Sequence, residues 1–298
     1  LRSFTETTLP QAWPAAAAGA LLVALYVLSD FGAVALLRVD AFTRVIYTSY
    51  RASFDRVGAT VLALVLVSLA LLLVVAERRI RGRRHRWRVG VGTQRRAVAV
   101  NLRGLSMALA VAWLALLTGL ALGVPLVSLS LRMLQGSRTP LDVGELASAA
   151  VNSFGVAAAG AVLAVALALP VANLSARYRT PMVRAIETVS YTGHALPGVV
   201  VGLSMVFLTL AVLPIAYQSV AALAFAYAVL FLPKAIGSIR SATAAVPPVL
   251  ELTARTLGRG PLRAWAATTL RYTLPGIATG GLLVLLTAMK ELPVTLML

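Results

Sequence analysis

The sequence predicts an all-α polytopic membrane protein with an internal repeat, and three observations support this fold class. Apolar residues make up 59% of the 298 residues and charged residues only 12%, whereas soluble domains carry about 25% charged residues. The apolar residues are concentrated in runs near the length that crosses a bilayer. In addition, the two ends of the chain align with each other without gaps.

Seven apolar segments reach, or nearly reach, the roughly 20 residues that a membrane-spanning helix needs. They are residues 15–37, 57–76, 105–131, 152–174, 195–212, 220–236 and 276–298. The second segment contains thirteen Leu or Val residues, each of which favours insertion by about 0.4 kcal/mol. The fifth and sixth segments are shorter and carry Pro214 and Pro233 near their ends, so their boundaries are set less sharply. We therefore expect about seven transmembrane helices.

The net charge of +17 is explained by membrane topology, not by nucleic-acid binding, because the Arg residues lie in clusters between the apolar segments. Cytoplasmic loops retain Lys and Arg. Residues 77–104 contain ten Arg and one Glu, which predicts a cytoplasmic linker. Counting spans from this linker puts residues 1–14, 175–184 and 246–275 on the same side. The predicted external loop 38–56, with four Arg and two Asp, fits the rule least well.

Residues 1–37 align with residues 262–298 at an offset of 261 residues. Thirteen of the 37 aligned positions are identical, including the Thr-Thr-Leu that begins at Thr7 and at Thr268, and Asp30 aligns with Glu291. Both copies have the same predicted orientation, so the repeat is parallel, as in transporters built from two equivalent halves. A transport pathway is then expected between the halves.

A polar stretch, residues 251–276, separates the last two apolar segments. The sequence predicts a short helix that starts at Pro248 and stops at Gly258 in a left-handed cap, and a second short helix after Pro261. The first helix carries one apolar stripe at helical spacing, made of Leu250, Ala254 and Leu257. Two interpretations fit this pattern: a bent helix pair that a soluble partner holds, or an amphipathic linker that touches only lipid.

The stretch resembles the coupling loop of the permeases of binding-protein-dependent ABC importers. The resemblance rests on Glu251, Ala254, Arg255, Leu257 and Gly258. These residues are followed by a Thr-Thr-Leu and then by an apolar span. The family's pattern is Glu-Ala-Ala, three residues, Gly, nine residues, an aliphatic, any residue and Leu-Pro. Gly258 matches this pattern, and Ala254 and Arg255 stand where the family usually has Ala-Arg.

The C-terminal copy departs from the family's pattern at two places. Leu252 occupies the family's Glu position, with Glu251 one residue early, and Leu270-Arg271 stands in place of Leu-Pro. In the N-terminal copy, Thr-Thr-Leu-Pro is intact and ends at Pro10. We therefore expect the two halves to couple unequally to their energy source.

Over nearly its whole length the chain is similar to the ferric-iron members of this family, in which one polypeptide carries both permease halves. The supporting segments are residues 27–50, 152–179, 194–205 and 287–298. The resemblance implies three regions. Residues 1–77 would be the end of the first half, with part of its coupling loop and its last two spans, and residues 78–104 the basic cytoplasmic linker. Residues 105–298 would be the second half, with five spans, a coupling loop at about 246–275 and its last span missing.

This resemblance implies a multi-pass protein of the bacterial inner membrane that translocates ferric iron. Its expected partners are an external substrate-binding protein, cytoplasmic ABC ATPase subunits in two copies, and membrane lipid, with no nucleic acid and no cofactor. The residues implied in coupling to the ATPases are Glu251, Ala254, Arg255, Gly258 and Arg263, with Leu9 and Pro10 of the first copy.

Charged residues within the predicted spans are candidates for the translocation path, because an ionised side chain costs about 2.5 to 3.5 kcal/mol there. The candidates from the first and last spans are Asp30, Lys290 and Glu291. They either line a wet path for a cation or form hydrogen bonds and salt bridges between helices. Pro197 and Gly198 either break the fifth span, so that backbone lines a cavity, or form a kink used for packing.

The sequence contains no phosphate-binding GxxxxGK[ST] loop and no apparent catalytic set, so ATP hydrolysis is expected on a separate subunit. His85 and His194 lack the neighbours of a metal site, and we assign no metal ligand. Three alternatives remain. They are a permease of the same class for thiamine, polyamine or phosphonate, an ion-coupled secondary transporter, and an intramembrane enzyme.

Overall fold

The computed structural model describes residues 9–82, 103–136, 142–178, 180–193 and 196–298. Every regular element in these ranges is a helix and none is a strand, which confirms the all-α prediction. The chain divides into a larger unit, residues 1–85 and 150–298, and a smaller unit, residues 86–149. The predicted linker 78–104 lies mostly outside the described residues.

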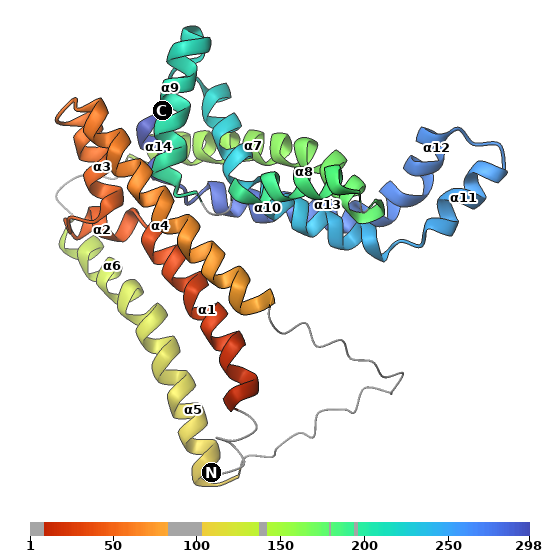
Figure 1. Ribbon diagram of the computed structural model, residues 1–298. Coiled ribbons are helices and arrows are strands. Elements are labelled where there is room, and N and C mark those ends of the chain that lie inside the picture. Colours follow the sequence, from red (N-terminus) through yellow and green to blue (C-terminus); the bar gives the residue numbers. More distant parts are fainter. Residues whose placement is uncertain (1–8, 83–102, 137–141, 179, 194–195) are drawn as a thin grey trace. The chain divides into compact units, whose positions relative to one another are not determined.

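The larger unit contains most of the helices (Figure 1). In its N-terminal part these are α1 (Leu9–Ser29), α2 (Gly32–Leu36), α3 (Phe42–Arg51) and α4 (Arg56–Gly82). Its C-terminal part contains α8 (Pro181–Thr192), α9 (Gly198–Val212), η4 (Pro214–Ala216), α10 (Val220–Ala245), α11 (Pro248–Thr256), α12 (Pro261–Trp265), η5 (Ala266–Leu270), α13 (Arg271–Ala288) and α14 (Pro293–Met297). The smaller unit contains α5 (Leu105–Thr118), η2 (Gly119–Gly123) and α6 (Val124–Gln135). Helix α7 (Val143–Arg177) starts in the smaller unit and continues into the larger one.

All seven predicted apolar segments contain a helix. Five helical stretches are long and apolar enough to cross a bilayer, namely 56–77, 105–135, 143–177, 220–245 and 261–288, and two shorter apolar helices cover 16–29 and 198–212. Large apolar side chains on these helices face outward, as contact with lipid requires. The chain is therefore a polytopic membrane protein.

The first and last predicted spans are not continuous helices, which corrects the placement of Asp30, Lys290 and Glu291 well inside their spans. Helix α1 ends at Ser29 and α13 ends at Ala288, and each is followed by a turn and a five-residue helix. The reason is local. The Asp30 carboxylate accepts a hydrogen bond from the Ala33 amide at 3.1 Å, which favours a new helix start.

The break after α13 has a different local cause. Pro293 lacks an amide hydrogen and is suited to the first turn of a helix, so it favours a new start for α14 over continuation of α13. The three charged residues therefore lie at helix breaks, where their amides form short-range hydrogen bonds of turns.

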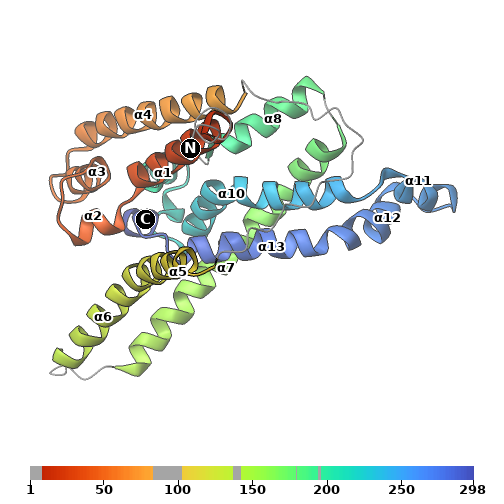
Figure 2. The same ribbon diagram turned by 90° about the horizontal axis from the view of Figure 1, so that it is seen from below.

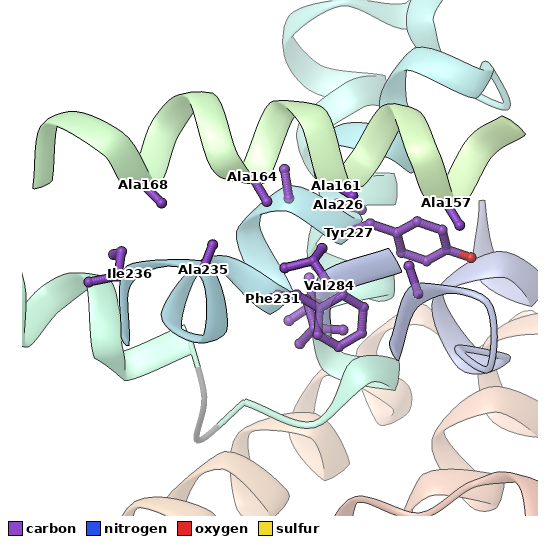
Figure 3. Close-up of a cluster of buried hydrophobic side chains, with 14 of the residues drawn as sticks. Ala157, Ala161, Ala164, Ala168, Ala226, Tyr227, Phe231, Ala235, Ile236 and Val284 are labelled. Atoms are coloured by element: carbon purple, nitrogen blue, oxygen red, sulfur yellow. The ribbon is translucent and has the colours of Figure 1, made fainter. Parts of the chain in front are cut away.

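The core of the larger unit lies between α7, α10 and α13. Helix α10 packs along α13 (Figure 2), and α7 presents a seam of small residues to α10. Figure 3 shows this seam, Ala157, Ala161, Ala164 and Ala168, beside α10. Gly160 lies in the same seam, and a Cβ there would come 2.9 Å from Cβ of Tyr227. Small residues thus allow close approach of the helices, as is common in membranes.

A second apolar cluster joins the N-terminal helices to α9. Helices α1 and α3 pack on α4, and α14 packs on α9. Ile46 of α3, Leu66 of α4, Val199 of α9 and Met297 of α14 are all fully buried in this cluster. The cluster brings the break that follows α1 and the break that follows α13 into one unit.

The predicted repeat is visible in the fold. Helices α2 and α14 are separated by the same 261 residues as the aligned sequences, and each follows a break after a longer apolar helix. Both copies therefore form the same local structure, a helix, an acidic break and a short second helix.

Candidate functional site

A cavity of about 480 Å³ lies where three helix breaks meet within the larger unit. We name it the helix-break cavity. Its lining comes from α1 and the break after it, from the break between α8 and α9, from α10, and from the end of α13 with the break after it. The lining residues are Leu22, Leu25, Tyr26, Ser29, Asp30, Phe31, Gly32, Gly193, Leu196, Gly198, Leu230, Phe231, Lys234, Thr287, Lys290, Glu291, Leu292 and Pro293.

Four charged side chains line this cavity, two acidic and two basic. Asp30, Lys290 and Glu291 were predicted as path residues from the sequence, and Lys234 of α10 is the fourth. Within the described residues, none of the ion pairs joins either lysine to either carboxylate. The four charges therefore share one cavity without being locked into salt bridges.

The two lysines are held by weaker contacts. Lys234 Nζ donates to Thr287 Oγ1 at 3.0 Å and lies 5.2 Å from the ring centroid of Phe231. Lys290 Nζ lies 5.8 Å from the ring centroid of Tyr26. Cation–π contacts of this kind are worth about 0.5–1 kcal/mol at exposed sites. Neither ammonium group is paired with a carboxylate in the described part of the chain.

Glu291 differs from the other three side chains in the environment of one carboxylate oxygen. Its Oε1 atom is buried and has no hydrogen-bond partner among the described residues. Gly198, the first residue of α9, leaves the space that Oε1 fills, since a Cβ at that position would overlap it. A buried carboxylate oxygen without a donor is costly, so it is available to a polar or cationic ligand.

The structure brings together four of the five predicted path residues in the lining of the helix-break cavity: Asp30, Lys290, Glu291 and Gly198. Pro197 is fully buried beside the lining and caps the start of α9. Helix α9 runs from Gly198 to Val212, so Pro197 and Gly198 stand at the start of the fifth predicted span and do not interrupt a helix there. Among the described residues, no group of three or more His, Asp or Glu side chains is arranged to hold a metal ion.

The polar stretch 251–276 lies in α11, α12, η5 and the start of α13, and Figures 1 and 2 show α11 and α12 beyond one end of α10 and α13. Helix α11 begins at Pro248, as predicted, and Gly258 has φ of +84°. The Gly258 amide donates to Arg255 O at 3.0 Å and the Arg259 amide to Ala254 O at 3.2 Å. These two bonds form a Schellman motif, which confirms the predicted left-handed cap.

Only part of the predicted apolar stripe of α11 is buried. Ala254 packs inside, with Ala264 of α12, whereas Leu257 is 78% exposed. Leu257 directly follows Thr256, the last residue of α11, and is the C-cap of the helix. Val249, Leu252 and Leu262 are also exposed, and Leu252 and Leu262 line a groove together with Leu174 and Arg177 of α7.

Glu251 points back toward the end of α7 and not to the outside. Arg255 donates to Glu251 Oε1 at 2.8 Å, and the Thr269 hydroxyl donates to Glu251 Oε2 at 3.3 Å. Arg177, the last residue of α7, donates to Thr269 Oγ1 at 3.5 Å. Arg263 lies exposed on α12. Leu9 and Pro10 form the first turn of α1, and Leu9 is 45% exposed.

The sequence interpretation missed two residues at these sites. Lys234 is a charged residue in an otherwise apolar span, a signal of function that was available from the sequence. Arg177 was counted only as one of the basic residues that set topology. No local pattern indicated its partners, because they lie 69 and 92 residues away along the chain.

Apolar helices that are broken around a charged cavity, with a polar helical bend at one end, define a membrane transport protein. No family model matches the chain. The chain is 33% identical over 97% of its length to the "Fe(3+)-transport system permease protein FbpB 2" of Haemophilus influenzae. About half of it is 36% identical to an ABC transporter permease protein of Streptomyces antibioticus. Half of it is 31% identical to the "Molybdenum transport system permease protein ModB" of Mycobacterium bovis.

These similarities support an ABC importer permease, in agreement with the resemblance found in the sequence. The chain spans 58% of the length of the Haemophilus relative and 60% of the Mycobacterium relative. The relatives are transport subunits, in agreement with the prediction that this chain is not an enzyme.

Proposed function

We propose that this chain is part of the transmembrane subunit of an ABC importer that translocates ferric iron. An external substrate-binding protein delivers the ion, and two copies of a cytoplasmic ATPase subunit supply the energy. The observation that carries this proposal is the similarity to the Fe(3+) permease over 97% of the chain, which includes both copies of the repeat. Residues 1–77 are then the end of one permease half and residues 105–298 belong to the other, joined by the linker 78–104.

The bend formed by α11 and α12 is the proposed ATPase-docking surface. Val249, Leu252, Leu257 and Leu262 are each more than half exposed there. Exposed apolar groups beside Arg255, Arg263 and Arg259 suit a groove with an apolar floor and an acidic rim on a soluble partner. Gly258 sets the angle of the bend, and Ala254 lets α11 and α12 approach closely. Leu9 and Pro10 are the matching end of the first coupling loop.

The helix-break cavity is the proposed translocation site. Asp30 and Glu291 supply carboxylate oxygens, which are hard ligands suited to a trivalent cation. The two positions are equivalent in the repeat and line one cavity. Gly198 and Pro197 keep the α9 end of the cavity open to Glu291. The ammonium groups of Lys234 and Lys290 balance the acidic charge when no cation is present.

Transport by the complete protein tests the substrate. The protein is reconstituted in proteoliposomes with its ATPase subunits and its substrate-binding protein, and uptake of labelled ferric iron is compared with uptake of thiamine, a polyamine, a phosphonate and molybdate. Molybdate is included because relatives named for molybdenum transport match half of the chain. ATP-dependent uptake of ferric iron alone supports the proposal. Uptake that follows an ion gradient and needs no ATP favours a secondary transporter instead.

Orientation is tested by labelling. The chain contains no Cys, so single cysteines can be placed at exposed positions such as Leu262 and Ile215. An impermeant thiol reagent added outside intact cells should label position 215 and not position 262. The opposite pattern would contradict the cytoplasmic placement of the coupling loop.

A further inference from the structure

We propose that Arg177 is a positioning residue that fixes the coupling loop against the ends of α7 and α10. This inference rests on the proposed function, because it explains how a movement of the coupling loop, driven by the ATPase, is passed to the membrane-spanning helices. Arg177 is the last residue of α7 and is partly buried. A cation in the last turn of a helix is also favoured by the helix dipole.

One guanidinium group joins three pieces of structure. Arg177 Nη1 donates to the carbonyl oxygen of Val246 at 2.9 Å, at the C-terminal end of α10. Arg177 Nη2 donates to Thr269 Oγ1 at 3.5 Å, in the π-helical turn η5 that leads into α13. The planar fork of Arg can serve both acceptors at once, which the single ammonium group of Lys does not do in the same geometry.

The links continue into α11 through buried groups. Thr269 is 2% exposed, and its hydroxyl donates to Glu251 Oε2 at 3.3 Å. Glu251 Oε1 accepts from Arg255 one helical turn later at 2.8 Å. Glu251 therefore belongs to an internal set of contacts that orders the loop, and is not free to point at a partner.

Apolar packing does not replace these hydrogen bonds. A groove of about 630 Å³ separates α7 from the coupling loop, and its lining includes Leu174, Arg177, Glu251 and Trp265. The indole Nε1 of Trp265 is buried there without a hydrogen-bond partner in the described part of the chain. Because the two sides are held apart by this groove, polar contacts from Arg177 carry the connection between α7 and the loop.

Hydrogen–deuterium exchange of the complete protein, without ATPase subunits, tests the positioning directly. We expect Arg177→Gln and Arg177→Lys to accelerate amide exchange in residues 246–270 by about tenfold, the effect of losing charge-assisted hydrogen bonds. Helices α1 and α4 should exchange as in the wild type. Arg184→Gln is the matched control, since Arg184 is an exposed arginine on α8 whose guanidinium makes no hydrogen bond among the described contacts. Thr269→Val, which keeps the side-chain shape, should reproduce part of the effect even if an Arg177 variant fails to fold.

The second readout is uptake per ATP hydrolysed in the reconstituted complex. Arg177 variants should retain bound ATPase and hydrolysis but lose most uptake per ATP, and Lys should not restore it. If the amides of residues 246–270 exchange in Arg177→Gln at the same rate as in the wild type, the proposal is wrong. Faster exchange with unchanged uptake per ATP also overturns it, because Arg177 would then order the loop without transmitting its movement. If the wild-type protein shows no ATP-driven uptake, the proposed function fails, and the exchange result still decides whether Arg177 positions the loop.

Discussion

The carboxylate of Glu291 occupies the space beside Gly198 in which a side chain at position 198 would begin. The first residue of α9 and the break after α13 are therefore fitted to each other. Gly198→Ala should displace the Glu291 carboxylate, which can move because it is the free end of a flexible side chain. We expect a fold that is retained and uptake that falls about tenfold, equivalent to about 1.4 kcal/mol.

Gly19→Ala is the matched control for this substitution, because a Cβ at Gly19 meets nothing within 4 Å. Uptake and melting temperature are measured for both variants. Equal uptake by the two variants would show that the contact between positions 198 and 291 has no role in transport.

Glu291→Gln should remove the negative charge from the helix-break cavity while keeping the size of the side chain. If Glu291 receives the cation, ATP-driven uptake of ferric iron should fall by at least about tenfold. Glu145→Gln, on the exposed first turn of α7, should leave uptake unchanged. Wild-type uptake by Glu291→Gln would assign this carboxylate to helix packing alone.

Gly258→Ala should weaken the bend of the coupling loop. Gly258 has φ of +84°, a conformation that costs a non-glycine residue about 1–2 kcal/mol. Gly260→Ala is the matched control, because Gly260 has φ of −60° and open space at its Cβ. Gly258→Ala should lower both the amount of ATPase subunit that co-purifies and the rate of uptake, whereas Gly260→Ala should lower neither. Equal behaviour of the two variants would contradict a role for the left-handed cap.

Leu262→Ser should weaken ATPase binding without unfolding the protein. Leu262 is 81% exposed, and exposed substitutions usually change stability by less than about 0.5 kcal/mol. Loss of an anchor residue from an interface commonly costs about 2 kcal/mol or more, so the affinity measured in detergent should fall by more than tenfold. Ile215→Ser, at 89% exposure in η4, is the control with no expected effect. Unchanged affinity for Leu262→Ser would place the interface elsewhere.

Gly160→Ala should destabilise the packing of α7 on α10. The added Cβ would lie 2.9 Å from Cβ of Tyr227 and 3.3 Å from the carbonyl oxygen of Ala224, and neither atom is the end of a flexible chain. We expect a loss of about 1–3 kcal/mol, seen as a lower melting temperature. Gly155→Ala, on the same helix with nothing within 4 Å, should not lower it. A melting temperature equal to the wild type would mean that α7 and α10 can separate at little cost.

Much of the fold could be predicted because hydrophobic periodicity and helix signals are local. The seven apolar segments each contain a helix, and Pro248 and Gly258 begin and end α11 where the sequence indicated. The breaks after α1 and α13 were not predicted. Mean hydropathy over 20 residues is insensitive to one polar residue, whereas a single carboxylate or proline is enough to start a new helix.

The amino-acid pattern alone identifies an all-α membrane protein with a repeat, and it singles out Asp30 and Glu291 as equivalent positions. The packing of distant helices places Lys234 in one cavity with these two residues and brings Arg177 to Thr269. The difference lies in the range of the interactions. Membrane insertion and helix capping depend on neighbours within a few residues, whereas a cavity and a hydrogen bond between distant helices depend on how small residues such as Gly160 and Gly198 let those helices approach.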